Sequence, residues 1–230
     1  MGMNVVDKID DKVRINTMLV SVSDKTGLDT FIPGMVAANP GLKILSTGGT
    51  FGKIKEILGD RADGVLEQVS AYTGQPETQG GLVKTLDFKI YLGLLTETYN
   101  DAHQEDLKRT GALSIDMVVV NLYPFSDTIA KDGVTVENAR GNIDIGGPTM
   151  IRASAKNFIR VASVVDPASY GDILDKVKAQ DGALSLADRY ELAKKAFAHT
   201  SEYDTAISKY LAAQAFDQVK SCYNTMPGKA

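Results

Sequence analysis

Short apolar runs rich in β-branched residues recur along the chain and alternate with stretches of helical periodicity. Five runs fit buried strands, and they span residues 17–23, 42–47, 64–70, 115–123 and 160–166. Helical patterns lie at about 27–38, 50–58, 104–110, 135–141, 148–157 and 169–179. Strands that alternate with helices require right-handed crossovers between parallel neighbours. The sequence therefore predicts an α/β fold, with a mainly parallel sheet and helices on both of its faces.

Two of the helical stretches have unusual sequences. The stretch at 27–38 contains Pro33 and Gly34, which both disfavour a helix, so only the need for a crossover supports it. From Ser185 onward, apolar residues recur at helical spacing, which predicts one long helix or two with Ser185 as the N-cap. We therefore expect an N-terminal extension, an α/β domain and a C-terminal helical segment, at 1–16, 17–184 and 185–230.

Composition excludes several classes of protein. The net charge of −4 over 230 residues gives no global basic field for nucleic acid or an acidic membrane. No apolar run approaches the roughly 18 residues that span a bilayer, and the N-terminus lacks a signal-peptide apolar region. The single cysteine, Cys222, forms no internal disulfide and fits a reducing compartment. We therefore expect a cytoplasmic location.

Two loops with anion-binding character follow the first two strands. In open parallel sheets, ligands bind beyond the carboxyl ends of the strands. The loop SVSDKTG at 21–27 offers hydroxyls and an ammonium to a phosphate, although Ser23 or Asp24 can instead cap the following helix. The loop STGGT at 46–50 offers bare backbone at a helix N-terminus, which favours phosphate, although a Gly-Gly turn also serves packing.

Three further segments carry candidate chemical groups. NLYPF at 121–125 follows the strongest strand and contains Tyr123, which can also be an ordinary buried aromatic. NIDIGGPTM at 142–150 contains Asp144 before a helix start, where capping is the alternative role. Lys84, in GGLVKTL, can equally be a surface lysine. The two histidines and the lone cysteine form no metal constellation.

Taken together and in order, these motifs resemble the inosine monophosphate (IMP) cyclohydrolase domain of the bifunctional purine-biosynthesis enzymes. The motifs are SVSDKTG, STGGT, GGxVKTL, NLYPF, NIDIGGPTM and ASAKN, and the resemblance runs from about Leu19 to about Tyr210. In that family an AICAR transformylase domain follows. The sequence stops before it, so we expect a stand-alone cyclohydrolase.

The resemblance implies a methylglyoxal synthase-like sandwich with a mainly parallel sheet of about five strands, and a homodimer. It implies ring closure of 5-formamidoimidazole-4-carboxamide ribonucleotide to IMP, with loss of water and without metal or other cofactor. A separate formyl-transferring enzyme is an implied partner. The carboxamide nitrogen is a weak nucleophile that needs a base, and the formyl oxygen needs a donor or a cation.

Matching motif by motif carries the family's site residues onto this chain. Asp144 is then the group that orients or deprotonates the carboxamide, and Lys84 and Tyr123 stabilise the formyl oxygen. Lys156 matches the proton donor or acceptor. The substrate-binding positions are Ser21, Ser23, Asp24, Lys25, Ser46, Thr47, Gly48, Gly49, Thr85, Asn121, Ile145 and Gly146.

One segment departs from the family pattern. Leu82 replaces an arginine near the phosphate, Asp87-Phe88 replaces His-Pro, and Tyr91-Leu92 replaces His-Gly. Loss of a charge-assisted phosphate contact predicts about 1.5–3 kcal/mol weaker binding, unless Arg152 or another cation offsets it.

Two other functions compete with the cyclohydrolase. The departures at 82–92 favour a nucleotide-binding or regulatory module of the same fold without turnover. A triose-phosphate lyase similar to methylglyoxal synthase is disfavoured, because NLYPF and IDIGGPTM are not motifs of that family.

Overall fold

A five-stranded parallel sheet lies at the centre of the computed structural model, which describes residues 5–76, 78, 83–226 and 228. The strand order is β4-β3-β2-β5-β6, and every neighbouring pair is parallel. The strands are β2 (Thr17–Val22), β3 (Lys43–Ser46), β4 (Leu66–Gln68), β5 (Met117–Asn121) and β6 (Ala162–Val164). The expected sheet of about five strands is thereby confirmed.

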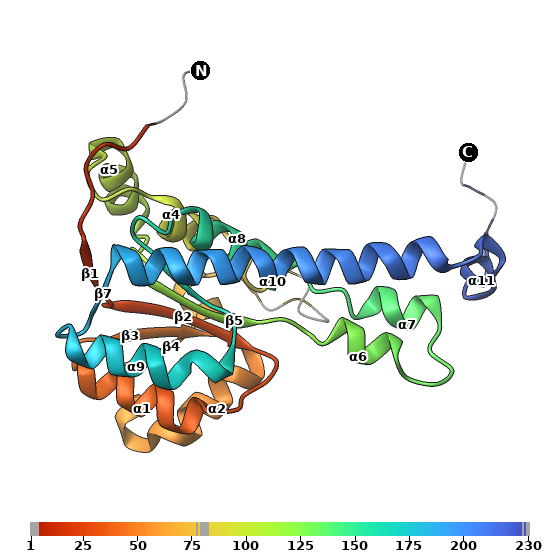
Figure 1. The fold of residues 1–230 in the computed structure, drawn as a ribbon, viewed down its shortest axis with the longest axis horizontal. Helices are drawn as coiled ribbons and strands as arrows, with labels where there is room; N and C mark the ends of the chain where they lie inside the picture. The colour runs from red at the N-terminus through yellow and green to blue at the C-terminus, as the bar shows by residue number, and fades with distance from the viewer. Residues whose placement is uncertain (1–4, 77, 79–82, 227, 229–230) are drawn as a thin grey trace.

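The apolar runs are continuous because both faces of the sheet are covered. All five residues of β5 are buried, and successive side chains enter opposite layers. In β2, Met18 and Val20 pack into one apolar cluster, whereas Leu19 packs into the other. The first cluster joins the sheet to α1, α2 and α9, and the second joins it to α4, α8 and α10 (Figure 1).

The helices form the two outer layers of the sandwich (Figure 1). The longer helices are α1 (Leu28–Ala38), α2 (Gly48–Leu58), α4 (Phe88–Leu95), α5 (Asp101–Thr110), α8 (Gly146–Lys156), α9 (Tyr170–Ala179) and α10 (Leu186–Ala213). The shorter helices are α3 (Val69–Thr73), α6 (Phe125–Ile129), α7 (Val136–Gly141) and α11 (Phe216–Ser221), with 3-10 turns at Gly59–Ala62 and Pro167–Ser169. The sequence patterns did not predict α3, α4 or α6.

The questioned helix at 27–38 is regular. α1 contains Pro33, and its Gly34 lies against Leu174 of α9. A Cβ on Gly34 would lie 2.4 Å from a methyl carbon of Leu174, so glycine is what permits the two helices to pack at this distance. The weak helix propensity of this stretch is therefore offset by close packing between α1 and α9.

The N-terminal region and the start of the C-terminal helix are joined by a second, small sheet. β1 (Lys12–Arg14) pairs antiparallel with β7 (Ala183–Ser185), which the sequence patterns did not predict. α10 begins directly after β7, and Ser185 caps it as expected. The Ser185 hydroxyl accepts from the Asp188 N–H at 3.2 Å, and the Asp188 carboxylate accepts from the Ser185 N–H at 3.2 Å.

Removal of this cap has a predictable effect on stability. We expect Ser185→Ala to lower the free energy of unfolding by about 1 kcal/mol, because two backbone N–H groups lose reciprocal acceptors. Urea unfolding followed by circular dichroism measures the change. Ser201→Ala, at an exposed position within α10, is the matched control. Equal stabilities for the two variants would contradict the capping role.

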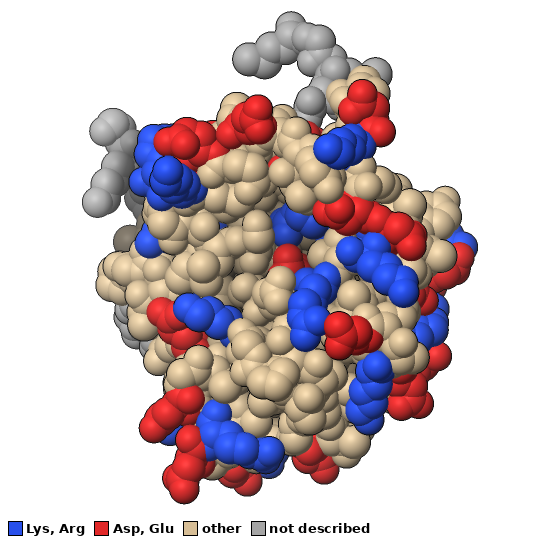
Figure 2. All heavy atoms as spheres, turned by 90° about the vertical axis from the view of Figure 1, so that its left-hand side faces the viewer, with Lys and Arg blue, Asp and Glu red and all other residues tan. Residues whose placement is uncertain are grey.

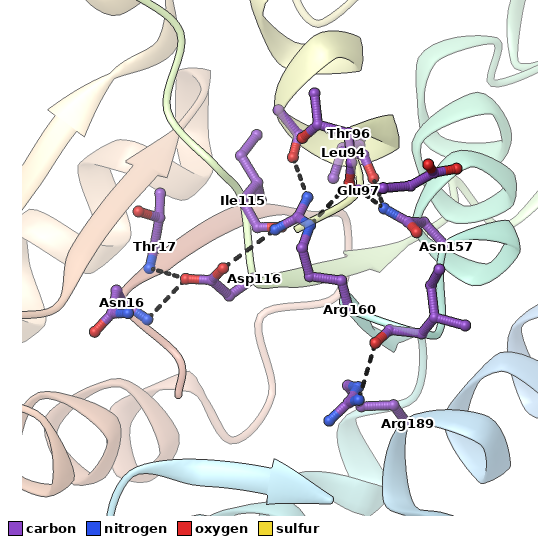
Figure 3. A network of polar contacts seen from close by, with 12 residues as sticks. Asn16, Thr17, Leu94, Thr96, Glu97, Ile115, Asp116, Asn157, Arg160 and Arg189 are labelled. Carbon is purple, nitrogen blue, oxygen red and sulfur yellow. Dashed lines mark hydrogen bonds and ion pairs between the residues drawn. The ribbon is translucent and has the colours of Figure 1, made fainter. Parts of the chain in front are cut away.

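A buried polar network lies at the amino ends of β2, β5 and β6 (Figure 3). The side chains of Arg160 and Asp116 are 6% and 9% exposed and form an ion pair at 3.2 Å. Asp116 also accepts from the backbone N–H groups of Asn16 and Thr17 at 2.9 and 3.0 Å. Burial raises the pKa of the Asp116 carboxyl, and the Arg160 guanidinium opposes that shift. The pair thus ties the start of β2 to the segment before β6.

Arg189, in the first turns of α10, is fully buried and donates to five backbone carbonyls. The acceptors are Asp10, Asp11, Phe158, Ile159 and Leu184. They come from the N-terminal region, from the segment before β6 and from β7. A single guanidinium therefore joins three parts of the chain that are distant in sequence.

Charges of both signs are interspersed on the face that includes the small β1–β7 sheet. Figure 2 shows lysine and arginine side chains beside aspartate and glutamate over this face, without a patch of one sign. No helix in the described part of the chain combines the length and apolar character needed to cross a bilayer.

Candidate functional site

A cavity of about 540 Å³ opens beyond the carboxyl ends of β2, β3 and β5. Its size is in the range of small-molecule sites. The residues that line it are Ser21, Val22, Ser23, Lys25, Thr47, Gly48, Gly49, Thr50, Val83, Lys84, Thr85, Leu86, Val120, Asn121, Tyr123, Gly141, Asn142, Ile143, Asp144, Ile145, Gly146, Gly147 and Met150. Segments far apart in sequence therefore meet at one edge of the sheet.

One wall of the cavity is an anion cradle at the N-terminus of α2. Gly48 opens the helix with a φ of 46°, in the left-handed region that favours glycine. The Lys84 ammonium lies 3.3 Å from where a Cβ on Gly48 would be. Ser21 and Thr47 face each other there, with their hydroxyl oxygens 3.1 Å apart. Free N–H groups, hydroxyls and an ammonium together suit a phosphate.

Asn121, at the end of β5, holds the neighbouring loop in place. Its side-chain oxygen accepts from the N–H groups of Ser23 and Asp24 at 2.7 and 2.9 Å, and its amide nitrogen donates to the Asp24 carbonyl at 2.8 Å. The side chain lines the cavity but is committed to this loop. Its main local effect is to fix the backbone that carries Ser23 and Lys25.

A second wall of the cavity is the turn that opens α8. Asp144 accepts from the Gly147 N–H at 2.8 Å, so its side chain makes the capping contact that the sequence left open. A Cβ on Gly147 would lie 2.7 Å from an Asp144 carboxylate oxygen, and one on Gly146 would lie 2.7 Å from the Thr85 hydroxyl. The two glycines therefore let the carboxylate and Thr85 approach the helix N-terminus closely.

Most of the residues expected in the site lie around this cavity. They are Ser21, Ser23, Lys25, Thr47, Gly48, Gly49, Lys84, Thr85, Asn121, Tyr123, Asp144, Ile145 and Gly146. Tyr123 is 57% exposed, so it is not the ordinary buried aromatic considered as the alternative. Asp24, Ser46 and Lys156 do not line the cavity.

The residues outside the cavity have local structural roles. Ser46 is fully buried and donates to the Val20 carbonyl at 2.7 Å. The Asp24 carboxylate accepts from the Thr26 N–H at 2.9 Å. Hydrogen bonding with Thr26 is also the main cause that lowers the pKa of Asp24. Both side chains stabilise the loops that carry the site, and neither forms part of the inner surface of the cavity.

Lys156 and Arg152 lie outside the cavity. Lys156 is the last residue of α8, about 15 Å along the helix axis from the glycines that face the cavity. Arg152 lines a separate groove between α8 and α10, where its guanidinium lies 5.6 Å from the centre of the Phe197 ring. Arg152 therefore does not replace the missing arginine in this chain. Of the described cavity residues, Lys25 and Lys84 carry positive charge.

The segment that departs from the family pattern has its own contacts. Leu82 lies outside the described residues. Asp87 caps α4, because its carboxylate accepts from the Lys89 N–H at 2.7 Å. The Tyr91 hydroxyl lies 2.6 Å from the Thr149 hydroxyl, which in turn donates to the Gly146 carbonyl at 2.9 Å. Asp87 and Tyr91 thus support α4 and the glycine turn.

The sequence patterns did not predict a side cavity or one residue that supports the site from α10. The side cavity shares Thr47 and Lys84 with the main one and continues along Gln68, Ser70 and Gln75. These residues lie at and after the carboxyl end of β4, so the rule that ligands bind at the carboxyl ends of strands could have found them. The supporting residue is Tyr203 on α10, whose hydroxyl accepts from the Asp144 N–H at 2.8 Å.

Two family models match the sequence. The model of the MGS-like domain matches residues 35–149, which is half of the chain, and the model of the AICARFT/IMPCHase bienzyme matches residues 154–229.

Similar proteins are found among curated sequences and solved structures. The bifunctional purine biosynthesis protein PurH of Magnetococcus marinus is 47% identical over 200 residues, which cover 87% of this chain and 36% of that protein. PurH of Ruminiclostridium cellulolyticum is 46% identical over 197 residues, which cover 86% and 37%. The chain thus spans little more than a third of these relatives. The crystal structure of ForH superposes with a TM-score of 0.74 at 28% identity, covering 86% of this chain and 97% of that one.

Proposed function

Since the chain belongs to the MGS-like domain family, we propose that it is an IMP cyclohydrolase. In this proposal it closes 5-formamidoimidazole-4-carboxamide ribonucleotide to IMP with loss of water. The name of the PurH relatives and the AICARFT/IMPCHase model support purine biosynthesis as the setting. The observation that carries the proposal is the cavity that joins a phosphate-like cradle to Lys84, Tyr123 and Asp144.

The two walls of the cavity suit the two ends of such a nucleotide. The start of α2, with Ser21, Thr47 and Lys25 nearby, is where we place the 5′-phosphate. The Asp144 turn, with Ile145 and Gly146, is where we place the carboxamide. A helix N-terminus favours an anion on each wall, and at α8 that anion is the Asp144 carboxylate itself.

Each proposed group answers one demand of the reaction. The carboxamide nitrogen forms a bond to the formyl carbon and gives up one proton, for which Asp144 is the acceptor. Negative charge grows on the formyl oxygen, where the Lys84 ammonium and the Tyr123 hydroxyl are the stabilising donors. That oxygen leaves as water with two protons, which derive from the carboxamide and formamido nitrogens. The balance needs no oxidant or reductant.

The setting in the cell is part of the proposal. The substrate already carries a formyl group, so a formyl-transferring enzyme must supply it. The single cysteine is in keeping with the cytoplasm. Homodimerisation is proposed from the family resemblance.

Formation of IMP by the purified protein tests this function. We expect native protein to convert the formylated ribonucleotide and Lys84→Met to lower kcat by about 10²–10³-fold, because the developing oxyanion loses a charged donor. Lys89→Met is the matched control. Lys89 lies on α4, where its ammonium faces the Tyr72 ring outside the cavity lining.

Two outcomes separate the enzyme from a binding module. Calorimetric titration with IMP runs beside the assay and measures affinity independently of turnover. If the native protein binds IMP but forms none above the uncatalysed rate, the enzyme proposal fails and a nucleotide-binding module replaces it. If Lys84→Met and Lys89→Met turn over equally, the role of Lys84 is wrong.

A further inference from the structure

The second half of α10 lies beside the loops that carry the site. In Figure 1 the helix runs along one side of the sheet and continues past it alongside α6 and α7. α10 contacts α6, which begins directly after Tyr123 and Pro124. The helix is therefore close to two of the segments that line the cavity, although no residue of α10 lines the cavity itself.

Tyr203 of α10 holds the Asp144 turn through one hydrogen bond. Its hydroxyl accepts a hydrogen bond from the Asp144 N–H at 2.8 Å. Within the described residues, this is the hydrogen bond that the Asp144 N–H donates. The carboxylate of the same residue accepts from the Gly147 N–H at 2.8 Å. Asp144 is thus held at its backbone from α10 and at its side chain from α8. Burial raises the pKa of the Tyr203 phenol.

The same helix supports the loop that presents Tyr123. The Tyr203 ring meets Phe125 edge-on at a centroid distance of 6.2 Å, and the Tyr210 ring does so at 5.8 Å. Phe125 is buried, and its N–H donates to the Tyr123 carbonyl at 2.8 Å. Two tyrosines seven positions apart share one helix face and clamp Phe125.

We propose that Tyr203 is a positioning residue that sets the Asp144 carboxylate for proton transfer, an inference that rests on the proposed cyclohydrolase function. Its hydroxyl fixes the backbone from which the carboxylate projects. A base displaced by about 1 Å loses much of its effect on rate, while substrate binding by the other wall is retained. In this proposal α10 contributes to the site by positioning Asp144.

The matched pair Tyr203→Phe and Tyr210→Phe tests the role of the hydroxyl. Both variants keep the ring that packs on Phe125. Within the described residues the Tyr210 hydroxyl makes no hydrogen bond, so its removal leaves the loops as they are. We expect Tyr203→Phe to lower kcat about 10–100-fold with the Kd for IMP within twofold of native. Tyr210→Phe keeps native kcat.

Amide hydrogen exchange at Asp144 reports on the bond without reference to activity. We expect the Asp144 amide to exchange faster than native in Tyr203→Phe and at the native rate in Tyr210→Phe. Thermal unfolding of both variants checks that each is folded. Native kcat in Tyr203→Phe, or equal loss in both variants, overturns the positioning role. A native protein that forms no IMP overturns the proposed function instead, and the positioning role of Tyr203 fails with it.

Discussion

We expect replacement of Asp116 by alanine to lower the free energy of unfolding by about 3–5 kcal/mol. The change leaves the Arg160 guanidinium buried without its counter-charge, at a site where both side chains are less than a tenth exposed. It also removes the acceptor of the Asn16 and Thr17 N–H groups. Unpaired buried charges and donors are among the few defects that produce losses of this size. Chemical denaturation in urea gives the value directly.

An exposed ion pair supplies the control for this change. Asp106 pairs with Arg109 at 2.7 Å, but the two side chains are 44% and 64% exposed. We expect Asp106→Ala to lower stability by less than about 1 kcal/mol, because solvent screens the pair. A loss in Asp116→Ala no larger than that in Asp106→Ala would show that the buried network contributes little to the fold.

The second large effect is on catalysis. We expect Asp144→Asn to lower kcat for IMP formation by about 10²–10⁴-fold, because the base is lost. Asparagine keeps a side-chain oxygen that accepts from the Gly147 N–H, so the start of α8 is retained. Stability should therefore change little while activity collapses. Steady-state kinetics and thermal unfolding of the same preparation measure both quantities.

This substitution separates the two roles that the sequence allowed for Asp144. A residue that only caps a helix tolerates asparagine, and full activity in Asp144→Asn would establish capping alone. Asp166→Asn is the matched control. The Asp166 carboxylate caps a 3-10 turn by accepting from the Ala168 N–H at 2.9 Å, and Asp166 is not among the residues that line the cavity. We expect native kcat in that variant.

The five strands were predictable because a covered parallel sheet makes each strand an apolar run. Their spatial order was not, since the runs carry no information about which strand lies beside which. β1 escaped detection because three residues with one apolar side chain, Lys12–Arg14, form no pattern until they meet β7. α4 was hidden because FKIYLGLL is apolar nearly throughout and shows neither period clearly.

The candidate site was predictable in its loops and less so in individual side chains. Motif order identified the segments that meet at the carboxyl edge of the sheet, because that edge is fixed by parallel topology. It did not indicate that Lys156 lies at the far end of α8 from the cavity, or that Ser46 points into the core. Tyr203 of α10 accepts a hydrogen bond from Asp144, which is 59 positions away in the sequence, and no local sequence pattern predicts such a contact.

The β1–β7 sheet has a consequence for the order of folding. One of its strands lies near the N-terminus and the other directly precedes α10, and Arg14 and Asp181, which form an ion pair beside it, are 167 positions apart. Closing so long a loop is unfavourable until other contacts shorten it. During synthesis, all five strands of the central sheet leave the ribosome before β7 does. We therefore expect the central sheet to assemble first and the N-terminal strand to close late, when α10 docks.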